Sequence, residues 1–175
     1  MIEMHIRTSI LIAAISIFIA GCSGTSTNHS NTIGINYGTP GNRFTPADIA
    51  KLKWIEGTWK GMDGDKPFYE RYRLEDSTLV VDSFTDETLN TVESTGRFEL
   101  NNGEFGKTEG DQRSAAISIT DNNIQFGPAA GSRGNYFRFE RQNDGTWNAV
   151  LEWPASGDKP ARQKIYRMEP ARSAK

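Results

Sequence analysis

Histidine is nearly absent from this chain of 175 residues, where it occurs only as His5 and His29. Both positions precede the part of the chain that alternates like β-strands, so a domain folded from residue 45 onward holds no imidazole. Serine-type catalytic triads and most zinc sites depend on imidazole as a base or as a ligand. The sequence therefore excludes the commonest hydrolase designs, and we predict no catalytic residue, no metal site and no cofactor.

The chain also lacks a concentration of positive charge. Its 20 Lys and Arg residues are dispersed among 22 Asp and Glu residues, and the formal net charge is -2. Binding to a phosphate backbone depends on a dense surface of Lys and Arg side chains. We therefore expect no nucleic acid among the partners of this protein.

No hydrophobic run is long enough to cross a bilayer as a helix. The run TSILIAAISIFIA, residues 8–20, is uncharged but falls short of the roughly 20 residues that a membrane-spanning helix needs. Arg7 provides a basic residue on its N-terminal side. This length and this flank are typical of a secretory signal peptide, which we predict over residues 1–21.

Cys22 is the only cysteine of the chain, so it cannot form an internal disulfide. The sequence Ile19-Ala20-Gly21-Cys22 directly follows the apolar run and resembles the lipobox of bacterial lipoproteins. The resemblance implies cleavage before Cys22 and a diacylglycerol on its thiol. Ser23 at the next position implies the outer membrane of a Gram-negative cell, with the protein facing the periplasm or exposed at the surface. The alternative is an ordinary secretory signal with an incidental cysteine.

The segment after the cysteine has few large apolar side chains and is rich in Ser, Thr, Asn and Gly. Such a composition cannot offset its ordering entropy by burial. We predict a flexible, lipidated tether over residues 22–44, one folded domain over 45–170 and a disordered tail over 171–175.

The folded domain is predicted to begin with a short helix over residues 46–55, since Thr45 can cap it, Pro46 suits its first turn and Gly57 follows it. Beyond Gly57 the apolar residues alternate with period two, and dipeptides such as Asn102-Gly103 separate the runs. The alternation predicts about ten strands: 58–62, 67–74, 77–84, 90–100, 104–108, 113–120, 123–126, 135–142, 146–153 and 162–168.

Short antiparallel strands with tight turns and one helix are compatible with a closed barrel or with a two-sheet sandwich. Nearly every connection is short enough for a hairpin, whereas sandwiches of the Greek-key type need long crossovers. We therefore predict an all-β fold, an antiparallel up-and-down barrel of about 8–10 strands with one short N-terminal helix.

A short helix, then WIEGTWKG at 54–61, then a meander that ends in Ile165-Tyr166-Arg167 resembles the lipocalin and fatty-acid-binding superfamily. IEGTWKG followed by PFYERYRLEDSTLVVDSF is similar to small, often exported, bacterial lipocalin-like domains of unknown function. The resemblance implies that Trp59 points inward at the base of the barrel, that Gly57 lets the helix pack closely and that Arg167 stacks on the indole.

Two family features are missing. The His-Asp-Phe-Pro segment of many relatives is replaced by FGPAAGSRGNYF, residues 126–137. The barrel of nitrobindin has a similar Gly-Thr-Trp opening and ligates haem iron through histidine, which this domain lacks, so the resemblance carries no expectation of haem here.

Glu70 shares a parity with Phe68, Tyr72 and Leu74, so it is a candidate for the barrel interior. Three interpretations are open: a contact to the polar group of a ligand, half of a structural ion pair, or a surface charge on a bulged strand. Together with aromatic and apolar residues of the last strands, the candidate ligand-lining set is Glu70, Tyr72, Phe137, Phe139, Trp147, Leu151 and Trp153.

These features lead to a membrane-anchored lipoprotein whose barrel binds or carries a small apolar or amphipathic ligand in the cell envelope. The alternative is an envelope interaction module with a solidly packed barrel, because nine Phe, five Tyr and four Trp could fill the interior. An isomerase that uses Glu70 and a tyrosine is a more distant third, and we expect a protein without enzymatic activity.

Overall fold

A computed structural model describes residues 41, 43–132 and 134–171 of the chain. The predicted signal peptide, Cys22 and nearly all of the predicted tether lie outside the described residues, as does most of the predicted tail.

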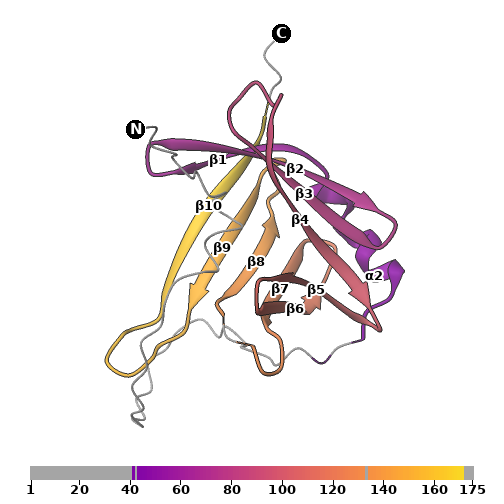
Figure 1. The fold of residues 1–175 in the computed structure, drawn as a ribbon. Helices are drawn as coiled ribbons and strands as arrows, with labels where there is room; N and C mark the ends of the chain where they lie inside the picture. Colours follow the sequence, from indigo (N-terminus) through magenta and orange to yellow (C-terminus); the bar gives the residue numbers. More distant parts are fainter. Residues whose placement is uncertain (1–40, 42, 133, 172–175) are drawn as a thin grey trace, which may run out of the picture.

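Ten antiparallel strands form a closed barrel in which each strand pairs with its neighbours in the sequence and β10 pairs with β1 (Figure 1). The strands are β1 (Gly57–Asp63), β2 (Lys66–Glu75), β3 (Thr78–Phe84), β4 (Val92–Asn101), β5 (Glu104–Glu109), β6 (Gln112–Ile119), β7 (Asn123–Pro128), β8 (Tyr136–Arg141), β9 (Trp147–Trp153) and β10 (Arg162–Pro170). This arrangement confirms the predicted all-β, up-and-down barrel, and it is consistent with a lipocalin-like fold. Each of the ten expected strands is present.

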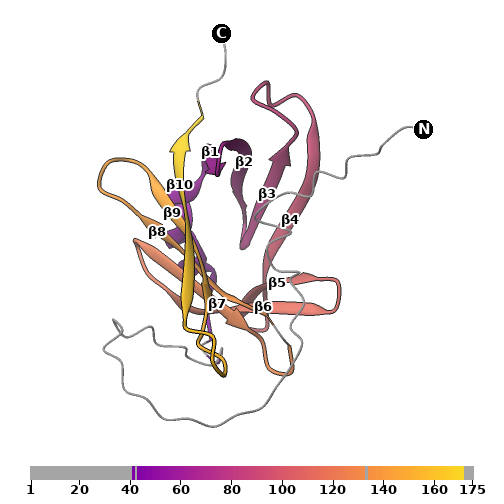
Figure 2. The ribbon, with the colours of Figure 1, turned by 90° about the vertical axis from the view of Figure 1, so that its left-hand side faces the viewer.

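Figure 2 shows how the wall is divided. Strands β2, β3 and β4 lie on one side of the barrel, β8, β9 and β10 on the other, and β5 to β7 join the two sides. Strand β1 closes the barrel between β2 and β10.

One end of the barrel is covered by the predicted helix, which consists of α2 (Pro46–Ala50) and a 3-10 turn, η1 (Lys51–Ile55). Its first turn is fixed by Asp48, whose Oδ2 accepts a 3.0 Å hydrogen bond from the backbone N–H of Thr45. The helix buries Ile49, Leu52 and Ile55 completely. We call this the helix end. The long connections β3–β4, β7–β8 and β9–β10 all lie at the opposite end.

The segment that leads into the helix is joined to the barrel by a 2.7 Å hydrogen bond from the N–H of Phe44 to the carbonyl of Gly103, in the β4–β5 turn. Figure 1 shows the helix beside the tips of β2, β3 and β4. The helix end is therefore closed by short turns and an amphipathic helix.

Strict alternation breaks down at local positions on β6 and β9. The register of β6 against β7 shifts between Ala116 and Ser118, so Ile117 lies in a bulge and does not share a regular face with Ile119. On β9 the outer face is largely shielded from solvent, because Val150 and Glu152 are both 1% exposed. Glu152 contacts the guanidinium of Arg138 on the neighbouring strand, so its buried charge is paired.

Candidate ligand site inside the barrel

Trp59 lies where the resemblance placed it, on the inner face of β1 at the helix end, with 7% of its surface exposed. Its indole N–H donates a 2.7 Å hydrogen bond to the carbonyl of Ile55, the last residue of η1. Its ring meets the edge of Trp147 at a centroid distance of 5.9 Å, and Trp147 in turn contacts Trp54 at 6.4 Å. Three indoles and the helix thus close this end of the barrel.

Gly57 begins β1 directly after the helix, and the reason for a glycine there differs from the expected close packing. A Cβ at this position would lie 3.6 Å from Nε1 of Trp59, which is ordinary contact. Its φ of 133° is a conformation that side chains other than hydrogen rarely adopt. The glycine therefore allows the chain to turn from the helix into the barrel.

Arg167 does not stack on Trp59. Its side chain is 52% exposed on the outer face of β10, and its Nη2 contacts Oδ2 of Asp144 at 2.5 Å. Its Nε lies 3.6 Å from Glu169. The β8–β9 turn provides a carboxylate on the outside of the barrel, and the inner face beside Trp59 is occupied by Trp147 and Met168.

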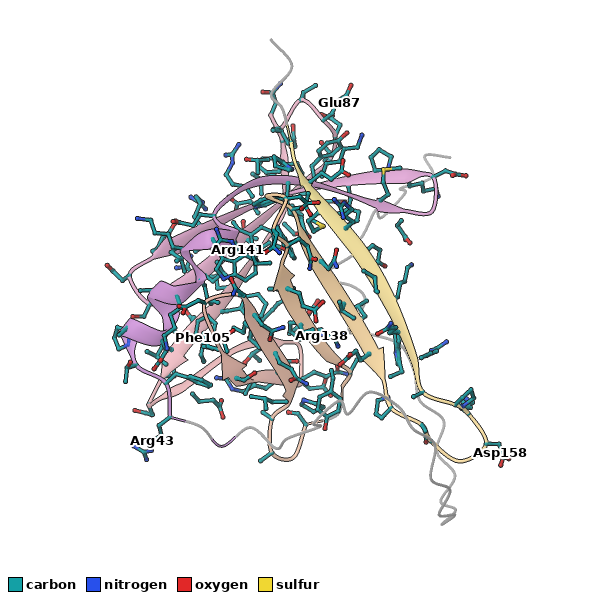
Figure 3. All side chains as sticks on the ribbon, turned by 180° about the vertical axis from the view of Figure 1, so that it is seen from behind. Arg43, Glu87, Phe105, Arg138, Arg141 and Asp158 are labelled. Atoms are coloured by element: carbon teal, nitrogen blue, oxygen red, sulfur yellow. The ribbon has the colours of Figure 1, made fainter. Side chains whose placement is uncertain are left out.

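An aromatic layer fills the helix half of the interior. Tyr72, Phe139 and Trp147 contact one another at centroid distances of 5.1 to 6.2 Å. A second group joins them from β4 to β8, in which Phe126 stacks on Phe137 at 4.5 Å and Phe98 lies 5.0 Å from Phe126. Phe105 is fully buried on the helix side of this group (Figure 3). Five of the predicted lining residues therefore belong to one packed cluster: Tyr72, Phe137, Phe139, Trp147 and Leu151.

Leu151 and Trp153, the two members of the predicted set that follow Trp147 on β9, lie farther from the helix than Trp147. Leu151 is 4% exposed and pairs with Phe137 across the β8–β9 ladder. Trp153 is only partly buried, and the guanidinium of Arg162 lies 4.7 Å from its ring centroid. Trp153 thus stands near the end opposite the helix, in reach of solvent.

Glu70 is completely buried on the inner face of β2, so the surface interpretation is wrong. Its Oε2 accepts a 2.7 Å hydrogen bond from the hydroxyl of Tyr72, and the hydroxyl of Ser83 lies 3.4 Å from Oε1. Hydroxyl donors from two adjacent strands therefore stabilise this carboxylate within the barrel.

The Tyr72 hydroxyl is protonated at neutral pH. Complete burial raises its pKa well above the ordinary value of 10, and the charge of Glu70 raises it further. Tyr72 therefore acts as a hydrogen-bond donor to Glu70 and cannot serve as a base.

Polar side chains continue from Glu70 across the inner wall. The register aligns Glu70 with Ser83 on β3 and Ser83 with Ser94 on β4. Farther round, Lys107 on β5 is paired with Ser114 on β6, and both are buried. Along β2 to β6 the interior is therefore apolar toward the helix and polar toward the other end, whereas Phe68 and Tyr166 continue the apolar core beside β1.

Two atoms of this polar half are buried without a hydrogen-bond partner in the described part of the chain: Oγ of Ser94 and Oε1 of Gln112. A buried polar atom without a partner costs about 1–3 kcal/mol. Sequence reasoning missed these positions and Lys107. The parity of Ser94 with Phe98 and of Lys107 with Phe105 was the available signal, but a polar residue in an alternating strand is normally assigned to the outside.

Within the described residues, His, Cys, Asp and Glu side chains do not gather in groups of three or more that could hold a metal ion. The same residues contain no helix that is long and apolar enough to cross a membrane. Comparisons with protein-family models, with curated proteins and with solved structures each find no match to this chain.

Proposed function

We propose that this protein is a lipid-anchored envelope protein whose lipocalin-like barrel holds one small amphipathic ligand. The graded interior carries the proposal: aromatic rings fill the helix half, and Glu70, Ser83, Ser94 and Lys107 lie toward the other half. An interior that served only as a core would gain nothing from these polar groups, because each must be desolvated. A ligand with an apolar body and a polar group matches both halves.

The ligand would be small. Barrels of this size have an interior just wide enough for side chains or for one small molecule, and the aromatic layer already occupies the helix half. The ligand would therefore lie toward the end opposite the helix, in contact with the rings of the aromatic layer. It would lie between Leu151 and the polar row, by which we mean Glu70, Ser83, Ser94 and Lys107.

The experiment uses the full chain with Cys22→Ser and a neutral naphthylamine dye. We expect saturable binding at one dye per chain, quenching of tryptophan emission, and weaker binding in Leu151→Trp, where a larger side chain fills the proposed space. Cooperative unfolding is measured on the same sample, since partly unfolded chains also bind apolar dyes. A cooperatively folded protein that binds no dye and is purified from cells without a small molecule would disprove the proposal.

The lipid anchor rests on Ile19-Ala20-Gly21-Cys22 and is tested separately. Metabolic labelling with a palmitate analogue in a Gram-negative host should tag the wild-type protein and leave Cys22→Ser untagged. Fractionation should then place the labelled protein in the outer membrane. An untagged wild type would remove the anchor and leave the ligand proposal intact.

The packing of the aromatic layer favours a second candidate, an envelope interaction module that uses the outside of the barrel. Rings as close as the 4.5 Å between Phe126 and Phe137 are those of a solid core. The outer wall also exposes about half of Ile165 and Val92. This candidate predicts no dye binding and a partner protein that is recovered by crosslinking in the envelope.

A further inference from the structure

The barrel wall is weakly paired at the junction between β4 and β5. Only three residue pairs join them, from Glu99 with Gly106 to Asn101 with Glu104, whereas β3 and β4 are joined by seven. Beyond Glu99 the two strands diverge and leave a cleft of about 330 Å³. The cleft is lined by Thr95, Gly96, Arg97, Glu99, Lys107, Thr108 and Glu109.

Lys107 connects this cleft with the interior. It lies two residues after the fully buried Phe105, on the same face of β5, and it pairs with the buried Ser114. Lys107 therefore belongs to the inner face of β5. Its side chain is only 8% exposed, which is rare for lysine. Among the described residues, its ammonium has one hydrogen-bond acceptor, Oε2 of Glu109 at 3.0 Å. An ammonium has three donors, so Lys107 has the capacity to bind further acceptor oxygens.

The other charges of the cleft are more accessible to water. Arg97 and Glu99 are about half exposed and lie 3.9 Å apart on the outer face of β4. Glu109, the partner of Lys107, is 26% exposed and stands near the end of β5. A carboxylate in this position can turn toward solvent at little cost, whereas the ammonium of Lys107 cannot.

The inner side of the cleft has little bulk on β4. Gly96 carries no side chain there, and Ser94, two residues away on the same face, has the buried unpartnered hydroxyl described above. The aromatic ring of Phe98 follows on that face toward the helix. The hydroxyl of Ser94 and the ring of Phe98 are thus separated on the inner face of β4 only by Gly96.

We propose that the cleft between β4 and β5 binds the anionic head group of an amphipathic ligand, a carboxylate, sulfonate or phosphate ester, through the ammonium of Lys107. The anion displaces Glu109 toward solvent, and the apolar part of the ligand extends inward past Gly96 to the aromatic layer. This inference rests on the proposed ligand-binding function and gives its ligand a charge and a point of entry.

The test compares two dyes that differ only by an anionic group, N-phenyl-1-naphthylamine and 1-anilinonaphthalene-8-sulfonate, on the full chain with Cys22→Ser. In Lys107→Met, we expect the affinity for the sulfonate to fall by about tenfold or more while that for the neutral dye stays unchanged, as removal of a charge-assisted hydrogen bond predicts. Lys107→Arg should restore most of the affinity. Glu109→Gln should raise the affinity for the sulfonate, because it removes the competing carboxylate.

Lys164→Met is the matched control, since Lys164 lies on β10 and pairs with Asp63, far from this cleft along the barrel wall. Equal losses in Lys107→Met and Lys164→Met, or no loss in either, would overturn the inference. If Lys107→Met fails to unfold cooperatively, Glu109→Gln decides: it should raise the affinity for the sulfonate and leave that for the neutral dye unchanged. A wild type that binds neither dye would refute the proposed function itself, whereas one that binds both without any effect of Lys107 refutes only the head-group site.

Competition separates an amphipath from a free anion. Decanoate should displace the sulfonate dye, and inorganic phosphate at the same concentration should not. Displacement by phosphate alone would contradict a ligand with an apolar part.

Discussion

The Tyr72 hydroxyl donates a 2.7 Å hydrogen bond to Oε2 of Glu70, and both side chains are buried within the barrel. The two residues are two positions apart on one face of β2, so the hydrogen bond runs along a single strand. The bond marks the boundary between the aromatic layer and the polar row inside the barrel. The ring of Tyr72 belongs to the aromatic layer, and its hydroxyl belongs to the polar row.

Tyr72→Phe should lower the free energy of unfolding by about 1–3 kcal/mol, because it leaves the buried carboxylate of Glu70 without its closest donor. Urea unfolding of the full chain measures the change. A double-mutant cycle with Glu70→Gln should give a coupling of at least about 0.5 kcal/mol, as expected for residues in contact. Additive effects would mean that the bond contributes nothing to stability.

The same pair makes stability depend on alkaline pH. The pKa of Tyr72 is raised in the folded protein, so above pH 10 the unfolded chain loses this proton before the folded one does. The unfolded state then binds fewer protons, and stability falls as the pH rises from about 10 toward the folded pKa. Unfolding free energies between pH 8 and 11 should show this decline, and Tyr72→Phe should flatten it. A decline of equal slope in the variant would assign the effect to other groups.

Trp59→Ala should cost about 3–5 kcal/mol of unfolding free energy, the range for large aromatic side chains removed from a core. The loss combines a cavity beside Trp147 with a carbonyl of Ile55 that no longer receives the indole N–H. Denaturant unfolding is the measurement. Trp153→Ala is the control: its ring is only partly buried at the other end, so its cost should be clearly smaller. A loss below about 1 kcal/mol for Trp59 would contradict its role in closing the barrel.

Much of this fold is predictable because its signals are local. Thr45, Pro46 and Asp48 fix the start of the helix, and the two-residue turns at Gly64 and Gly103 set the hairpins, each glycine having a positive φ. The alternation then decides which side chains face inward. Trp59 was placed correctly because its position follows from one strand and one preceding helix.

The errors arise where a position depends on distant strands. Alternation cannot reveal the register shift at Ile117, which depends on how β6 meets β7. Nor can it show that Lys107 is buried, because a lysine beside Phe105 is equally compatible with a surface position until the ladder to Ser114 is known. Arg167 was assigned from the resemblance, and the assignment failed because this chain has an aspartate in the β8–β9 turn within reach of its guanidinium.

That aspartate provides the last prediction. The pKa of Asp144 is lowered from 3.8 to about 2, chiefly by the side-chain hydrogen bond from Thr146, then by the backbone N–H of Thr146, and then by Arg167. The hydroxyl of Thr146 lies 2.6 Å from Oδ1, while Arg167 contacts the other oxygen at 2.5 Å. All three interactions favour the charged carboxylate, so each one, when removed, should raise the pKa toward 3.8.

Carboxyl-detected NMR titration between pH 1.5 and 6 should therefore find Asp144 titrating near 2 in the wild type, clearly higher in Thr146→Val, and less raised in Arg167→Gln. The order follows from the ranking of the causes, since the hydroxyl donates a short bond and the exposed guanidinium is screened by water. Arg167→Gln should also leave the tryptophan emission of the protein unchanged, because Arg167 and Trp59 are on opposite faces of the wall. A marked change in that emission, with Asp144 unaffected, would restore the stacking of Arg167 on the indole that the family resemblance implied.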